Sequence, residues 1–393
     1  MTATSLDTSE KAGRFVGLEG YRGIAAMGIV VYHVYQHIEK NSEGSLGQRG
    51  DATYTVLHGL DGAVSLFFVL SAFLLTLPFI TKALNQNDAP SARSFLSRRA
   101  ARVLPLYFVA ILLVWAARNI NLPGTLIDLV EHLTFTQVYD NRYIFYTIGP
   151  AWSLAIEIQF YIVLAVLGTW GVRIAKGRSR RWVIVTTGAF LSLVAIASFA
   201  WKMAAWLTLD VAGDDWKVWF GFPAKADEFA LGALLALVVA ARSPQLSRWK
   251  ATAMALLGLG IVAIALATRP GGAGEHAAFH TINAVGFTLI IAASVMSPKV
   301  VMNRALNWGP VALVGTVSYS LYLWHEPLMI LLDNRGLLPA GGGYLAFAWG
   351  LAVVLPLAVG VAWVSYQAIE RPGLGLRGLV DRYGRSRDYY DGS

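Results

Sequence analysis

The chain has 393 residues, of which 56% are hydrophobic and 14% are charged, and its formal net charge is +8. Soluble domains carry about 25% charged residues, so this composition excludes an ordinary soluble enzyme and indicates a membrane protein. The chain contains no cysteine, which excludes disulfides, cysteine-ligated metal and a cysteine-borne acyl intermediate.

Ten apolar stretches are long enough to cross a hydrocarbon core of about 30 Å. We place these spans near residues 18–37, 58–80, 103–117, 150–170, 182–200, 220–241, 251–268, 276–296, 311–332 and 344–367. The predicted fold is therefore an all-α bundle of about ten transmembrane helices in a multi-pass protein of the cell membrane. Residues 1–14 and 373–393 read as polar tails.

Basic residues gather in every second connection between the predicted spans, for example at 93–102 and at 173–181. Connections rich in Lys and Arg face the cytoplasm, so both termini are expected on the cytoplasmic side. Because this pattern follows membrane topology, the net positive charge does not indicate a nucleic-acid partner.

Among the ionisable residues of the first span are Arg22 and His33, eleven positions apart. Eleven residues on a helix return to within about 20° of the starting direction, so both side chains share one face, about 16 Å apart. Ionisable residues inside a span usually serve a function. The alternative is that Arg22 is a flanking anchor and His33 a hydrogen-bonded interior histidine.

The third span opens with Arg98, Arg99 and Arg102, on the predicted cytoplasmic side. Guanidinium groups bind phosphate in bidentate fashion, so this cluster is a candidate site for a phosphate-bearing ligand. The alternative is a topology signal that contacts lipid headgroups.

Several titratable residues are expected at matching depth, in the outer half of the bundle. They are His33, Glu157, Asp227, Glu228, His325 and Glu326. Such a set on four helices favours a polar chamber over isolated interior hydrogen bonds. The residues that we expect to line its acceptor side are Trp152, Ser153, Tyr161, Tyr319, His325 and Glu326.

Six segments occur in a fixed order along the chain. They are Arg22 and His33 with ten residues between them, LFFVLSAFLL at 66–75, RRAARVLP at 98–105, WSLAIEIQFY at 152–161, SYSLYLWHEP at 318–327 and IERP at 369–372. Together they resemble the acyltransferase 3 family of integral-membrane acyltransferases, over residues 15–372. Ala72 stands where that family usually has glycine, which suggests looser helix contact, and Ser65 stands where it often has aspartate.

The resemblance implies transfer of an acyl group, expected to be acetyl, from cytoplasmic acyl-coenzyme A to an acceptor hydroxyl at the outer face. The expected acceptors are a glycan, a glycolipid or a small hydroxylated molecule, reached directly or through a separate extracytoplasmic partner enzyme. His33 would be the general base or a transient carrier of the acyl group. Glu157 would orient His33, while Arg22, Arg98, Arg99 and Arg102 would bind the donor. We expect no metal and no permanently bound cofactor.

Three other functions remain open at the level of sequence. A secondary-metabolite acyltransferase would share the same residues. A polytopic transporter or flippase would also contain a polar chamber, although such proteins usually show internal repeats, which this chain lacks. A haem-binding electron carrier could use His33 and His37.

Overall fold

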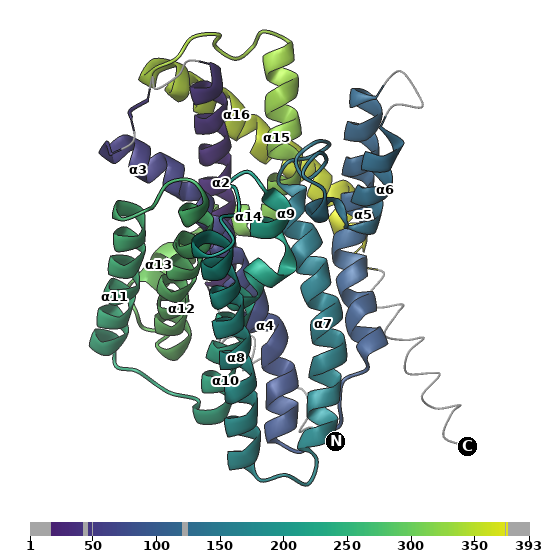
Figure 1. The fold of residues 1–393 in the computed structure, drawn as a ribbon, viewed down its shortest axis with the longest axis vertical. Helices are drawn as coiled ribbons and strands as arrows, with labels where there is room; N and C mark the ends of the chain where they lie inside the picture. Colours follow the sequence, from purple (N-terminus) through teal and green to yellow (C-terminus); the bar gives the residue numbers. More distant parts are fainter. Residues whose placement is uncertain (1–16, 42–45, 49, 120–124, 374, 376–393) are drawn as a thin grey trace.

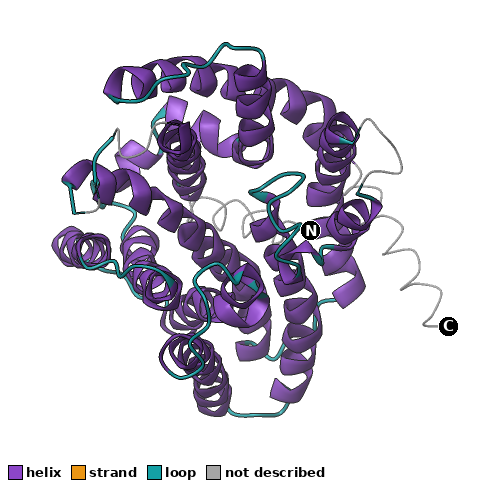
Figure 2. Ribbon diagram, turned by 45° about the horizontal axis from the view of Figure 1, so that its top comes forward, coloured by secondary structure: helices purple, strands orange, loops and turns teal. Residues whose placement is uncertain are grey.

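The structure is a computed structural model that describes residues 17–41, 46–48, 50–119, 125–373 and 375. The predicted polar tails lie outside these residues, except for Gly373 and Gly375. The described part is helical and contains no strand (Figure 2). The N-terminal half contains α2 (Leu18–Asn41), α3 (Ala52–Gly59), η1 (Leu60–Gly62), α4 (Ala63–Leu84), α5 (Ala92–Arg118), α6 (Leu126–Thr134), η2 (Gln137–Tyr139), α7 (Ala151–Ala175) and α8 (Arg180–Leu207). The C-terminal half contains α9 (Trp216–Phe220), α10 (Phe222–Arg242), α11 (Arg248–Ala267), η3 (Glu275–Phe279), α12 (His280–Met296), α13 (Met302–Leu306), α14 (Gly309–Thr316), α15 (Ser318–Asn334), α16 (Tyr344–Ser365) and η4 (Tyr366–Glu370).

Seven helical stretches among the described residues are long and apolar enough to cross a membrane. They cover residues 52–84, 92–118, 151–175, 180–207, 248–267, 275–296 and 344–373, which confirms the prediction of an all-α, multi-pass membrane bundle. The other three predicted spans correspond to α2, α10 and the α14–α15 pair. Helices α2 and α10 carry several charged residues, and α14 and α15 are each shorter than 18 residues. The count of ten spans stays a prediction.

The ninth predicted span is not one helix. It divides at Val317 into α14 and α15, and α15 continues through Pro327 to Asn334. Gly315 lies next to the division, at a point where α14 approaches α2 closely. A Cβ atom on Gly315 would lie 2.1 Å from the carbonyl oxygen of Glu19. Only glycine allows the two backbones to come this near.

Helix α4 lies at the centre of the packing. It contacts α7, α10 and α12, while α2 joins it to α14, α15 and α16 on the other side (Figure 1). The α4–α5, α7–α8 and α10–α11 connections lie together in the lower part of Figure 1. These connections and the helix ends that flank them contain basic residues that the topology prediction assigned to one side of the membrane, among them Arg93, Arg98, Arg173 and Lys176.

The closest approach between α4 and α10 depends on Gly232. A Cβ atom on this residue would lie 2.2 Å from the Val69 carbonyl oxygen and 2.8 Å from the Ala72 Cβ. Ala72 is itself fully buried. The expectation that alanine at position 72 loosens the helix contact is therefore wrong, because the glycine on the opposing helix makes room for its methyl group.

Gly232→Ala is expected to destabilise the protein by about 1–3 kcal/mol, because overpacking forces α4 and α10 apart. The matched control is Gly260→Ala on α11, where a Cβ atom meets nothing within 4 Å. The measurement is the thermal unfolding midpoint of both variants in detergent. Equal midpoints for the two variants would show that the close approach does not matter.

Candidate active site

A pair of histidines joins α2 to α15. The Nε2 atom of His325 lies 2.9 Å from the Nδ1 atom of His33, and the ring centroids are 4.9 Å apart. The Nδ1 atom of His33 also lies 3.0 Å from the Ile29 carbonyl oxygen. In the same way, the Nδ1 atom of His325 lies 3.1 Å from the Leu321 carbonyl oxygen. Each ring is thus fixed by its own helix and by the other ring.

These contacts determine which nitrogen of each ring carries the proton. A carbonyl oxygen only accepts hydrogen bonds, so each Nδ1 is the protonated nitrogen. His325 Nε2 is then an acceptor, and it shares the His33 Nδ1–H with the Ile29 carbonyl. The Nε2 atom of His33 is left with a free lone pair. A neutral imidazole in this state is equipped to accept a proton.

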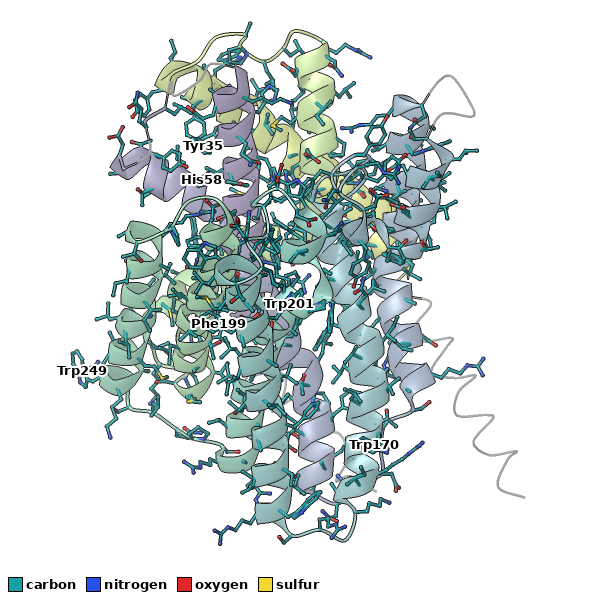
Figure 3. The ribbon with its side chains drawn as sticks, in the orientation of Figure 1. Tyr35, His58, Trp170, Phe199, Trp201 and Trp249 are labelled. Carbon is teal, nitrogen blue, oxygen red and sulfur yellow. The ribbon has the colours of Figure 1, made fainter. Side chains whose placement is uncertain are left out.

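His33 lines a cavity of about 540 Å³ formed by α2, α3 and α15. The residues that line it are His33, Tyr35, Gln36, His37, Glu39, Lys40, Tyr54, His58, Glu326, Met329 and Ile330. Tyr35 and His58, labelled in Figure 3, mark the side where α2 meets α3. Ligand pockets of proteins fall in the range of about 300–1,000 Å³, so this cavity can hold a small polar molecule or a sugar unit.

Glu157 belongs to a second polar group, formed by residues of α2, α4 and α7. The Ser71 hydroxyl donates to its Oε1 atom at 2.6 Å. Glu157 also interacts electrostatically with Tyr161, one turn along α7, and with Arg22 of α2. The Arg22 Nε atom donates to the Ser318 hydroxyl at 3.3 Å.

The arginine residues near the start of α5 interact with the polar group around Glu157. Arg99 and Arg102 interact electrostatically with Tyr161, and Arg102 also interacts with Arg22. Glu370, whose carboxylate accepts a hydrogen bond from the Ser320 hydroxyl, neutralises part of this positive charge. The structure therefore brings together Arg22, Arg99, Arg102 and Glu157, which the sequence suggested separately. The Arg98 guanidinium donates a hydrogen bond to the Ser94 hydroxyl on the same helix.

The structure places Glu157 differently from the role that we expected for it. Among the described residues, no hydrogen bond joins Glu157 to His33, because Glu157 faces Ser71 of α4. His325 instead occupies the position behind His33. Sequence reasoning placed His325 at the depth of His33, in the same polar chamber, and the structure adds the direct contact between the two rings.

The remaining predicted chamber residues hold the helices around these two groups. The Ser153 hydroxyl lies 2.6 Å from the Tyr322 hydroxyl, and the Tyr319 hydroxyl donates to the Val103 carbonyl at 2.8 Å. Glu326 lines the cavity and accepts a hydrogen bond from the Gly149 amide at 2.6 Å. Trp152 packs edge-to-face against Phe68 and Phe220, with ring centroids 6.1 and 4.3 Å away.

Asp227 and Glu228 do not join the His33 chamber. Asp227 forms a buried ion pair with Lys202, whose Nζ lies 2.7 Å from Oδ2, and it accepts from the Thr281 hydroxyl at 2.5 Å. The Glu228 carboxylate lies 3.5 Å from the Lys225 Nζ. The expectation of one chamber on four helices is wrong here, because equal depth does not make two residues lateral neighbours.

Comparison with known proteins identifies the family of the chain. A family model described as "Acyltransferase domain" matches residues 15–367. The chain belongs to the acyltransferase 3 family. Ser71, Tyr322 and Glu370, which sequence reasoning did not assign to the site, all lie in the segments LFFVLSAFLL, SYSLYLWHEP and IERP that carry the family resemblance. Their place in these segments was the sequence feature from which they could have been assigned to the site.

Two curated relatives are similar to this acyltransferase over most of its length. "O-acetyltransferase OatA" of Staphylococcus aureus is 24% identical over 380 residues, which cover 91% of this chain and 56% of the relative. "Putative peptidoglycan O-acetyltransferase YrhL" of Bacillus subtilis is 25% identical over 380 residues, which cover 91% of this chain and 54% of the relative. The chain thus spans about half the length of these relatives. No solved structure matches it.

Proposed function

We propose that the chain transfers an acetyl group from acetyl-coenzyme A to a hydroxyl of a glycan acceptor of the cell envelope. The observation that carries this proposal is the His33–His325 pair, which leaves a proton-accepting nitrogen of His33 beside a polar cavity. The names of the relatives support acetyl as the group and peptidoglycan or a similar glycan as the acceptor.

In the proposed reaction His33 is the general base. Its Nε2 takes the proton of the acceptor hydroxyl while the hydroxyl oxygen attacks the thioester carbonyl. The tetrahedral intermediate then collapses, the carbon–sulfur bond breaks, and the leaving thiolate of coenzyme A takes the proton from His33. His325 accepts the His33 Nδ1–H throughout and so stabilises the transient imidazolium. Direct transfer requires no acyl-enzyme.

Arg22, Arg99 and Arg102, here called the arginine group, form the proposed binding site for the donor. Arg99 and Arg102 reach inward from the start of α5 to the surroundings of Arg22. Arg22 precedes His33 by eleven residues on α2, a distance of about 16 Å along the helix axis. A pantetheine arm is of comparable length, so the nucleotide phosphates could lie on the arginines while the thioester reaches His33.

Replacing Arg98, Arg99 and Arg102 together by glutamine is expected to raise the KM for acetyl-coenzyme A by about tenfold or more, because charge-assisted bonds to phosphate contribute about 1.5–3 kcal/mol each. The measurement is the release of coenzyme A by protein in liposomes, with soluble peptidoglycan fragments as the acceptor. Arg142→Gln is the control, because Arg142 is exposed and paired with Asp140 outside the arginine group. An unchanged KM for the triple variant would remove the donor-site assignment.

A further inference from the structure

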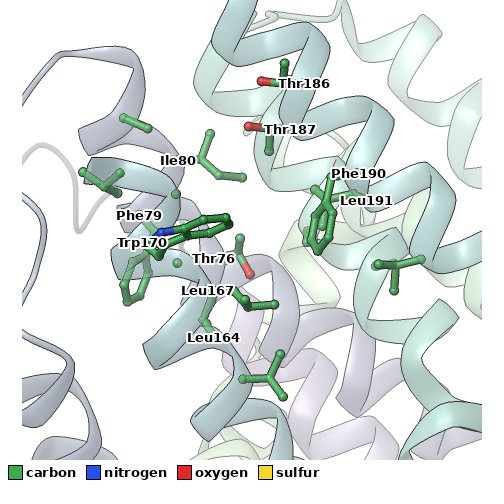
Figure 4. Close-up of a pocket in the computed structure, with 18 of the residues that line it drawn as sticks. Thr76, Phe79, Ile80, Leu164, Leu167, Trp170, Thr186, Thr187, Phe190 and Leu191 are labelled. Carbon is green, nitrogen blue, oxygen red and sulfur yellow. The ribbon is translucent and has the colours of Figure 1, made fainter. Parts of the chain in front are cut away.

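Helices α7 and α8 leave an open groove between them. A connection of only four residues, 176–179, joins the two helices, yet their facing sides enclose a volume of about 550 Å³ (Figure 4). Helices α4 and α10 form the floor of this groove. Its lining is apolar apart from a few hydroxyls, and it includes Phe79, Leu164, Leu167, Trp170, Phe190 and Leu191.

The groove opens toward the bilayer. Leu167, Trp170 and Phe190 line it and are 41%, 60% and 49% exposed, on two helices that are each apolar and long enough to span the membrane. A side chain that is exposed on such a surface faces lipid tails. Because close-packed interiors do not tolerate unfilled apolar volume of this size, hydrocarbon from the bilayer is the expected filling.

The groove is longer than one leaflet. Its lining runs from Phe160 to Ala175 on α7, about 22 Å along the helix axis, and from Trp182 to Val194 on α8, about 18 Å. Half of a hydrocarbon core of about 30 Å is about 15 Å. One extended acyl chain that entered at the end near Ala175 would therefore lie along most of the groove.

The end of the groove near Ala175 is strongly basic. Arg173, Arg178 and Arg181 are exposed there, and the Arg178 guanidinium lies 5.2 Å from the centre of the Trp182 ring, which lines the groove. Lys176 at the same end is already paired with Asp88. Exposed guanidinium groups at this level are suited to a lipid phosphate.

We propose that this groove is a phospholipid-binding site, with one acyl chain between α7 and α8 and the lipid phosphate on Arg173, Arg178 and Arg181. The site shares no lining residue with the cavity at His33. It therefore stands independently of the proposed acetyl transfer.

Two glycine variants test the proposal by native mass spectrometry of protein extracted from membranes in mild detergent. Gly171 lines the groove and a Cβ atom there meets nothing within 4 Å, so Gly171→Phe fills the groove without a backbone clash. Gly260 on α11 is equally open but lies outside the groove, so Gly260→Phe is the matched control. We expect one retained phospholipid on the wild type and the control, and occupancy at least about tenfold lower, or about 1.4 kcal/mol, on Gly171→Phe.

Equal lipid retention by the two glycine variants would overturn the proposal. The loss of a long-chain acyl-coenzyme A, rather than of a phospholipid, would overturn the assignment of the ligand. If Gly171→Phe fails to fold, liposomes containing phosphatidylglycerol with brominated acyl chains provide a second test. Brominated acyl chains quench the fluorescence of nearby tryptophans. The quenching is expected to be larger for the wild type than for Trp170→Phe, and equal quenching would contradict the site.

Discussion

Replacing His33 by alanine is expected to lower the rate of acetyl transfer by about 10²–10⁴-fold, the usual contribution of a positioned general base. The hydroxyl of the acceptor is a poor nucleophile until its proton is removed. His33 lines the cavity, and its Nδ1 is engaged by His325, which leaves Nε2 to accept that proton. The measurement is the release of coenzyme A from acetyl-coenzyme A in liposomes, with soluble peptidoglycan fragments as the acceptor.

A substitution of His325 tests whether the His33 pair acts in catalysis rather than only in folding. His325→Gln is expected to lower kcat while leaving the KM for acetyl-coenzyme A near its original value, because His325 orients His33 and lies apart from the arginine group. Gly260→Ala is the control for the effect of any substitution in a helix. A folded His33→Ala protein that transfers acetyl at the original rate would refute the role of His33.

Asp227→Leu is expected to destabilise the protein by about 3–5 kcal/mol, which is the usual cost of removing one partner of a buried ion pair. Lys202 is fully buried, and its ammonium group donates to Asp227 at 2.7 Å and to the Thr281 hydroxyl at 2.6 Å. Without the carboxylate, an uncompensated positive charge remains inside the bundle. The measurement is the thermal unfolding midpoint in detergent.

The paired variant Lys202→Met with Asp227→Leu tests whether the lone charge causes that loss. Replacing both partners by apolar residues of similar volume is often neutral, so the double variant is expected to recover most of the stability. Lys176→Ala, which breaks the exposed pair with Asp88, is the control and is expected to change little. A double variant that is less stable than Asp227→Leu would show that the pair does not act through its charge.

Sequence patterns were sufficient to predict the helical membrane bundle. The apolar stretches predicted the seven long apolar helices, and the ordered motifs predicted the family. The spacing of Arg22 and His33 predicted correctly that both lie on one helix, α2. These successes depend on hydrophobicity and helical period, which are local properties of the sequence.

The partners of the site residues could not be predicted in the same way. His33 and His325 are 292 positions apart, and their contact depends on how α2 and α15 are rotated toward each other. The distance of a residue from the end of its span gave an expected depth in the membrane, but no lateral position. Glu157 and Asp227 were therefore assigned to the level of His33, whereas the structure packs them against Ser71 and Lys202.

The most direct test of the proposed function measures acetyl esters in the cell envelope. Acetate released from envelope glycans by mild base would be compared between the source strain, a strain that lacks this protein, and strains complemented with the wild type or with His33→Ala. We predict that the wild type restores the lost acetyl esters and that His33→Ala, at equal protein level, does not. Full restoration by His33→Ala would contradict the account.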